Sequence, residues 1–177
     1  MSAHPVLILP GYDNSGPEHW QSLWERAHPD YRRVPQRSWT DPVCGEWVAA
    51  LDEAIGAAGA PPVLVAHSLG CLAVAHLALR HPRPIHGALL VAPPNVDDPA
   101  FPPIVTGFSP IPRARLPFPS IVVVGDDDWY VATDDARELA RAWGSRFVVV
   151  EKGGHLNPDA GFGAWPEGER LLAELLL

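Results

Sequence analysis

The stretch that decides the fold reads Val63-Leu64-Val65-Ala66-His67-Ser68-Leu69-Gly70, and Cys71-Leu72-Ala73-Val74-Ala75 follows it directly. A short, continuous apolar run that ends at a turn is typical of a strand buried on both faces. The small residues that come next favour a helix. A serine at such a sharp strand-to-helix turn has the layout of a nucleophile elbow, which holds its hydroxyl exposed at the end of the strand.

The elbow needs small neighbours because its turn is tight. Gly70 meets that need on one side of Ser68, and Ala66 stands where the usual Gly-x-Ser-x-Gly pattern has its first glycine. A serine at this place is also a good helix N-cap, which is the ordinary structural alternative. The five-residue pattern alone is weakly specific, but its setting between a strand and a helix, with acid and histidine candidates downstream, favours a catalytic role.

Strand-like and helix-like segments alternate along the whole chain, which predicts an α/β fold with a parallel sheet covered by helices on both faces. Asp41 and Pro42 predict a helix N-cap and first turn, and Thr133 or Asp134 is expected to cap a later helix. We expect six strands in the order 2-1-3-4-5-6. The expected strands are 6–9, 31–34, 62–66, 87–91, 120–124 and 146–150, and the expected helices are 17–27, 41 to 56 or 59, 68–80, 133 or 134 to 143, and 165–177.

Length and composition bound the class of protein. A chain of 177 residues with 47% hydrophobic residues predicts one domain, 1–177, with a substantial core. No apolar run is long enough to span a membrane, and the N-terminus leads into a strand without a signal-peptide pattern, so we expect a cytoplasmic location and no membrane partner. Thirteen basic residues against 21 acidic ones give a net charge of −8 without a basic cluster, which argues against a nucleic-acid partner.

The two cysteines, Cys44 and Cys71, are too few for a disulfide framework and lack the spacing of a zinc site. We expect both to be reduced and buried. Three adjacent aspartates further along the chain have no neighbouring ligand spacing for a cation. We therefore expect neither a metal nor a cofactor.

Three reactive residues follow three different predicted strands. Ser68 comes after the third strand, Asp128 after the fifth and His155 after the sixth. Parallel strands end at one edge of the sheet, which is where such folds bind ligands. The chain order Ser, Asp, His is the order of the α/β-hydrolase triad, in which serine attacks an acyl carbon, histidine moves its proton and the acid orients the imidazole.

The acid and the base each have competitors. Asp126 and Asp127 stand beside Asp128 and are the alternatives for the acid. We favour Asp128, and expect Asp126 to point into solvent or the lid and Asp127 to form a turn. Among the other histidines, His19 is the second candidate for a site role, and His67 is expected to pack beside the nucleophile. The remaining ones are expected at the surface or at helix ends: His4, His28, His76, His81 and His86.

An oxyanion formed on the substrate requires two backbone N–H donors. We expect these from Leu69, directly after the nucleophile, and from Tyr12, which follows Gly11 in the loop after the first strand. Aromatic residues are expected to line an apolar pocket, with core packing as the alternative. The predicted pocket residues are Gly11, His19, Trp20, His67, Trp129 and Tyr130, with Trp165 as a further candidate.

Prolines fill the segment between the fourth and fifth strands. Nine of the 27 residues from Pro93 to Pro119 are proline, a density that prevents a long helix. The position of the segment predicts a lid or wall over the carboxyl edge of the sheet. A covering loop without substrate contact and a partner-binding surface are the alternatives.

Taken together, these motifs resemble a small family of α/β-hydrolase-fold serine hydrolases that includes bacterial proteins and a vertebrate retinoblastoma-binding protein. The resemblance covers nearly the whole chain and implies the triad Ser68, Asp128 and His155 on a three-layer fold without a large cap domain. Trp129 departs from the family pattern, which has proline there. The matching segments are 9–21 (Leu-Pro-Gly-Tyr-Asp-Asn-Ser-Gly-Pro-Glu-His-Trp-Gln), 66–70, 128–131, 153–157 and 161–168.

The sequence thus predicts a serine hydrolase that forms an acyl-enzyme on Ser68 and acts on a small-molecule ester or amide. The favoured hypothesis is a carboxylesterase for small or medium acyl groups. An amidase or peptidase with the same triad is one alternative, and a protein-binding module with little turnover is another. The oligomeric state does not follow from the sequence.

Overall fold

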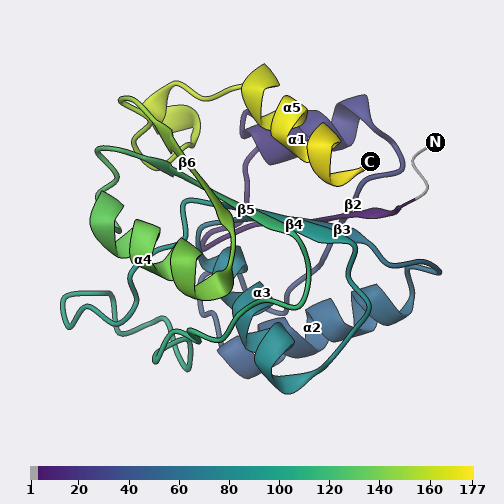
Figure 1. Ribbon diagram of the computed structural model, residues 1–177, viewed down its shortest axis with the longest axis horizontal. Helices are drawn as coiled ribbons and strands as arrows, with labels where there is room; N and C mark the ends of the chain where they lie inside the picture. The colour runs from purple at the N-terminus through teal and green to yellow at the C-terminus, as the bar shows by residue number, and fades with distance from the viewer. Residues whose placement is uncertain (1–3) are drawn as a thin grey trace.

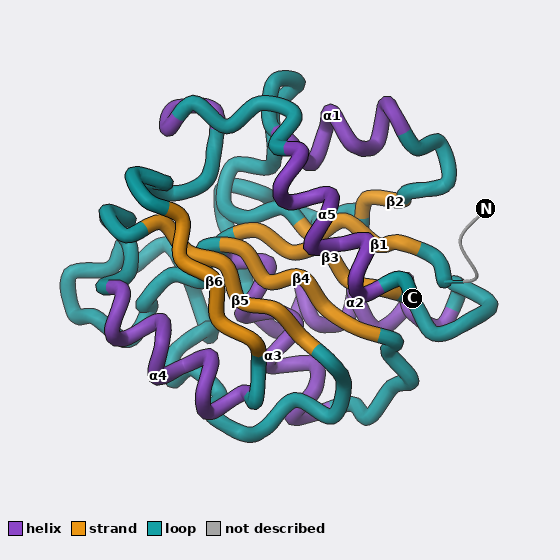
Figure 2. The backbone as a smooth tube through the Cα atoms, turned by 45° about the horizontal axis from the view of Figure 1, so that its top comes forward, coloured by secondary structure: helices purple, strands orange, loops and turns teal. Residues whose placement is uncertain are grey.

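Six parallel strands form one sheet in the order β2-β1-β3-β4-β5-β6, which confirms the predicted topology. The computed structural model describes residues 4–177. Figure 2 shows the strands side by side, with β6 at one end and β2 at the other. The strands are β1 (Val6–Leu9), β2 (Arg32–Arg33), β3 (Val63–His67), β4 (Gly87–Val91), β5 (Ser120–Gly125) and β6 (Arg146–Val150).

Helices cover both faces of this sheet, giving three layers. Figure 1 shows α1 and α5 on one face and α2, α3 and α4 on the other. The helices are α1 (Trp20–Ala27), α2 (Cys44–Gly56), α3 (Leu69–Arg80), α4 (Thr133–Trp143) and α5 (Pro166–Leu175), with a short 3₁₀ turn at Pro158–Ala160. Within residues 4–177 no cap domain is inserted between the strands.

Burial on both faces explains why the inner strands β1, β3, β4 and β5 are almost wholly apolar, whereas the edge strands β2 and β6 carry arginines and are partly exposed. Side chains of a strand alternate between the faces, so Leu7 and Leu9 pack into the core under α2, α3 and α4. Val6 and Ile8 point the other way, into the core under α1 and α5. In the part of the chain that the structure describes, no helix is long and apolar enough to cross a membrane.

The predicted caps of α2 and α4 are wrong. The helix α2 begins at Cys44 after Val43, because Val43 pairs with Thr106 of the Pro-rich segment and the Cys44 N–H donates to the Thr106 carbonyl. Asp41 lies before this bridge and caps nothing. The N-cap of α4 is Ala132, without a side-chain hydrogen bond, so neither Thr133 nor Asp134 serves that role.

Other boundaries differ from the prediction as well, most of them by one or two residues. The helix α1 starts at Trp20 rather than at residue 17, because the His19 side chain caps it by accepting a hydrogen bond from the Gln21 N–H. The edge strand β2 is only two residues long. In contrast, the Pro-rich segment is irregular as predicted, and Phe108, Ile111, Leu116 and Phe118 anchor it in the core.

Candidate active site

Ser68 occupies a sharp turn between β3 and α3. Its backbone has φ 53° and ψ −124°, a conformation that costs a non-glycine residue about 1–3 kcal/mol. The turn packs tightly against the end of β1: a β-carbon placed on Gly70 would lie 2.5 Å from the Leu9 carbonyl oxygen. The Ser68 side chain makes no capping hydrogen bond to α3, so it is not an ordinary N-cap serine.

The structure brings Ser68, His155 and Asp128 into one hydrogen-bonded chain. His155 Nε2 lies 2.9 Å from Ser68 Oγ, and His155 Nδ1 lies 2.9 Å from Asp128 Oδ2. The Asp128 side chain is fully buried and that of His155 is 11% exposed. An ionised carboxylate can only accept hydrogen bonds, so His155 Nδ1 carries a proton and donates a hydrogen bond to Asp128. His155 Nε2 is then free to accept a hydrogen bond from the Ser68 hydroxyl.

The two neighbouring aspartates hold the loop that carries the histidine. Asp126 Oδ1 accepts a hydrogen bond from the Lys152 N–H, and Asp127 Oδ1 accepts one from the Gly154 N–H, both at 2.7 Å. Asp128 alone of the three reaches the His155 ring. The sequence reasoning missed the loop-holding role of the other two, for which the only available signal was the unbroken run of three acids.

His67 links the nucleophile turn to the same loop. Its Nε2–H donates to the His155 carbonyl oxygen at 2.8 Å, and the two rings meet edge to face with centroids 4.9 Å apart. Burial lowers the pKa of His67 well below 6.5, and the nearby His155 and His19 lower it further. A neutral His67, which directly precedes Ser68, therefore ties the nucleophile turn to the backbone of the candidate base.

His19 lies in this cluster but does not reach Ser68. Its Nδ1 accepts from the Gln21 N–H, its ring packs against His67, and its Nε2 is buried without a hydrogen-bond partner in residues 4–177. Burial, together with Arg33 and His155, lowers its pKa from 6.5 to about 4. His76, expected at the surface or a helix end, is buried instead and contacts the Phe108 carbonyl oxygen.

The loop after β1 packs against the nucleophile turn. A β-carbon on Gly11 would lie 2.8 Å from Ser68 Cβ and 3.3 Å from the Leu69 nitrogen, so the loop after β1 runs directly against the elbow. Among the described residues, neither the Tyr12 N–H nor the Leu69 N–H has a hydrogen-bond partner. Both residues line the same cavity as Ser68.

That cavity has a volume of about 610 Å³ and is lined by three of the six predicted pocket residues, His19, His67 and Tyr130. Ser68, His155 and both predicted oxyanion donors, Tyr12 and Leu69, line it as well. The Pro-rich segment forms one of its walls, as the lid-or-wall hypothesis predicts. The sequence reasoning did not identify the rest of the lining, which is Asp13, Asn14, Gly16, Phe101, Pro102, Ile104, Val105, Asn157, Pro158 and Asp159.

Three of the remaining aromatic and glycine predictions require correction. Trp129 is 91% exposed and lies outside the cavity lining, because the Asp128 carboxylate turns back to accept from the Tyr130 N–H and leaves Trp129 at the outside of the turn. Trp20 is buried in the core, where its Nε1–H donates to the Leu156 carbonyl oxygen at 2.8 Å. Gly11 lies behind Ser68 rather than in the lining.

Trp165 is likewise a core residue, packed against Trp20. Through its hydrogen bond to the Leu156 carbonyl, Trp20 holds the loop of His155 in place without lining the cavity.

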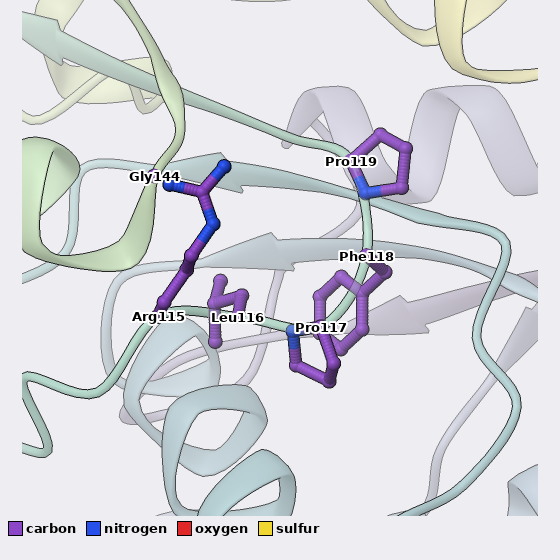
Figure 3. A pocket seen from close by; sticks show the side chains of 6 residues that line it. All are labelled: Arg115, Leu116, Pro117, Phe118, Pro119 and Gly144. Carbon is purple, nitrogen blue, oxygen red and sulfur yellow. The ribbon is translucent and has the colours of Figure 1, made fainter.

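A second cavity, of about 600 Å³, lies at the opposite edge of the sheet. Figure 3 shows it between the segment that enters β5 and the end of α4, with the Arg115 side chain extended toward Gly144. The other lining residues are Leu116, Pro117, Phe118 and Pro119. They include no nucleophile and no general base, so this cavity is not the candidate active site.

Comparisons with known proteins identify the family of the chain. Residues 6–174 match the family model described as serine hydrolase. A YdeN-like hydrolase from Pectobacterium atrosepticum is 32% identical, with 97% of this chain and 89% of that chain covered and a TM-score of 0.86. The ydeN gene product from B. subtilis is 21% identical, with 98% of each chain covered and a TM-score of 0.79.

A monoacylglycerol lipase from Paleococcus ferrophilus shares the fold at 15% identity, with 97% of this chain and 93% of that chain covered and a TM-score of 0.71. No curated protein matches the sequence. The family match spans nearly the whole chain, and the chain therefore belongs to the serine hydrolase family.

Proposed function

We propose that the protein hydrolyses carboxylic esters of small or medium acyl groups through a Ser68-His155-Asp128 triad. The observation that carries the proposal is the continuous chain of hydrogen bonds from Ser68 Oγ through the His155 ring to the buried Asp128 carboxylate. A serine hydroxyl is a weak nucleophile until a neighbouring base takes its proton. His155 is the base at the required distance, and Asp128 fixes its tautomer.

The reaction follows from these positions. Ser68 Oγ attacks the ester carbonyl carbon while its proton passes to His155 Nε2. The tetrahedral intermediate collapses, the bond to the leaving oxygen breaks, and that oxygen takes the proton from His155 to leave as an alcohol. A water molecule then attacks the acyl-enzyme, gives a proton to His155, and releases the carboxylic acid as Ser68 regains its proton.

Charge that develops on the carbonyl oxygen requires donors aimed at it before the reaction begins. The unpaired N–H groups of Tyr12 and Leu69, on either side of Ser68, are suited to this role. Loss of one such donor in other acyl-transfer enzymes costs about 10²–10³ in kcat. The proposed chemistry uses side chains and backbone amides of this chain alone.

The cavity supports an acyl group of limited size. Its volume of about 610 Å³ is in the usual range for small-molecule sites, roughly 300–1,000 Å³, and Phe101, Ile104 and Val105 provide apolar contact. The same triad is also able to cleave amides, so an amidase or peptidase is the alternative within this chemistry. Ester cleavage is favoured because an ester carbonyl is more electrophilic than an amide carbonyl, which is stabilised by resonance with its nitrogen.

A fluorophosphonate probe tests the proposal directly, since it bonds covalently to an activated serine. Wild-type protein should be labelled, Ser68→Ala should not be, and Asp128→Asn should be labelled on the order of 10⁴-fold more slowly. Thermal unfolding of each variant serves as the control for folding. Absence of labelling in wild type, or undiminished labelling of Ser68→Ala, would reject the triad and favour a protein-binding module.

Matched substrates then separate the two kinds of hydrolysis. p-Nitrophenyl butyrate and butyryl p-nitroanilide share an acyl group and differ only in the bond that is cleaved. We expect turnover of the ester to exceed that of the anilide, and His155→Ala to lower it by several orders of magnitude. A higher kcat/KM for the anilide would instead identify an amidase.

A further inference from the structure

The cavity around Ser68 has one strongly apolar wall. Phe101, Pro102, Ile104 and Val105 of the Pro-rich segment line it, and Ile104 remains 44% exposed. Tyr130 continues this wall toward the base, since its ring contacts both Phe101 and His155, with centroids 6.3 Å and 4.7 Å apart. An apolar chain placed here would bury surface on both sides.

The rest of the lining is polar and carries negative charge. Asp13 and Asn14 follow β1, and Asn157 and Asp159 follow His155. Apart from its histidines, the cavity is charged only at the two aspartates, and no lysine or arginine belongs to its lining. Within residues 4–177 neither Asp13 nor Asp159 forms an ion pair, so their charges are not neutralised by a neighbouring side chain.

Arg33 approaches this loop from outside the cavity lining. Its guanidinium donates to Asn14 Oδ1 and is paired with Glu25, which offsets part of its charge, although Arg33 still lowers the pKa of His19. An anionic ligand in the cavity would therefore meet two carboxylates in the lining and no lysine or arginine there.

The chemistry of the triad orients a substrate between the two walls. The leaving group receives its proton from His155 Nε2, so it lies on the side of that residue. Asn157 and Asp159 come from the same loop as His155, two and four residues further on. The acyl chain is then left to the apolar wall of the Pro-rich segment.

We propose that the site selects esters and thioesters that join an apolar acyl chain to a neutral or cationic leaving group, and that Asp13 and Asp159 reject anionic ones. The proposal rests on the proposed function and adds the charge class of the substrate. A cavity of about 610 Å³ is on the order of 10 Å across. A charged leaving group bound in it therefore lies within about 10 Å of each aspartate in the lining. At about 7 Å in water, one carboxylate favours a cation over an anion by roughly sevenfold before salt screening.

Three butyryl thioesters test this preference with a single acyl group and a single thiol assay. Their leaving groups are thiocholine, which is cationic, 2-mercaptoethanol, which is neutral, and mercaptoacetate, which is anionic. At low ionic strength we expect kcat/KM for the thiocholine ester to exceed that for the mercaptoacetate ester by at least about tenfold, and the ratio to shrink in about 0.5 M salt.

Charge-neutralising variants assign the effect to residues. Asp13→Asn and Asp159→Asn should each reduce the cation-to-anion ratio by roughly fivefold, and the double variant should reduce it further. Glu138→Gln, on the exposed side of α4 and outside the cavity lining, removes one negative charge as a matched control and should leave the ratio unchanged. Thermal unfolding of each variant shows that it is folded.

The outcomes separate the two proposals. Equal kcat/KM for the three thioesters, or a ratio that neither aspartate variant changes, overturns the charge preference while leaving the triad in place. If wild type cleaves p-nitrophenyl butyrate but none of the three thioesters, this inference is overturned alone. If it cleaves neither kind of substrate, the proposed function is overturned and this inference with it.

Discussion

Gly11→Ala offers a sharp test of the proposed oxyanion site, because this substitution adds one methyl group at the point where the loop after β1 meets the elbow. The added β-carbon would lie 2.8 Å from Ser68 Cβ. Carbon atoms in favourable contact are about 3.5–4.0 Å apart, so the loop and the elbow must separate by about 0.7–1.2 Å. Such a shift takes the Tyr12 N–H out of hydrogen-bonding range of an oxyanion that Leu69 still contacts.

We expect kcat for p-nitrophenyl butyrate to fall about 10²–10³-fold, equivalent to about 2.7–4 kcal/mol of transition-state stabilisation. KM should change far less, because the donor binds charge that appears only in the transition state. Crowding at the elbow should also lower the free energy of unfolding by about 1–3 kcal/mol, which urea denaturation measures.

Gly45→Ala is the matched control. It makes the same chemical change in α2, where an added β-carbon meets nothing within 4 Å, and it should retain wild-type kinetics. If Gly11→Ala keeps kcat within about threefold of wild type while remaining folded, Tyr12 is not the second oxyanion donor, since loss of a working donor costs at least about 10²-fold.

Three further predictions address the surroundings of the triad. Asp127→Ala removes the acceptor of the Gly154 N–H. We expect kcat to fall with little change in KM, and the free energy of unfolding to fall by about 1 kcal/mol. An unchanged kcat would show that this hydrogen bond does not position His155. Trp129→Ala should leave kcat/KM within about twofold of wild type, because that side chain is 91% exposed, and a larger loss would place it in the substrate path. The pKa of His19 is about 4 in the folded chain against 6.5 for the free side chain, so the unfolded chain takes up its proton first as the pH falls and stability is lost between these values. Between neutral pH and pH 5, His19 lowers the free energy of unfolding by about 2 kcal/mol. His19→Asn, which retains an acceptor for the helix cap, should therefore show a shallower acid loss in urea titrations; parallel curves for the two proteins would contradict the lowered pKa.

The strands and the parallel sheet follow from local pattern. Each buried strand is a short apolar run, which is typical of a strand covered on both faces. The intervening segments have the length and the spacing of apolar residues that are typical of helices. Ser68 could be identified for the same reason, since its turn is encoded by neighbours in the chain: an apolar strand before it and Gly70 after it. Caps were less well predicted, because Val43 is held at the start of α2 by Thr106, more than sixty residues away.

The membership of the cavity depended on tertiary structure. Trp20 and Trp129 are both aromatic residues near motif positions, yet one is fully buried in the core and the other is almost fully exposed. Their sequence neighbourhoods do not reveal this difference, because it depends on which way each side chain points after distant elements have packed.

By itself the sequence determined the α/β architecture and the three candidate reactive residues, because hydrophobic periodicity and turn chemistry are local properties. Only the tertiary structure decided that Asp128 rather than Asp126 or Asp127 meets the His155 ring, and that Phe101–Val105 and Asp159 share one cavity with Ser68. Hydrogen bonds and cavity walls join residues from distant parts of the chain, and their geometry is fixed only when the strands and loops pack together.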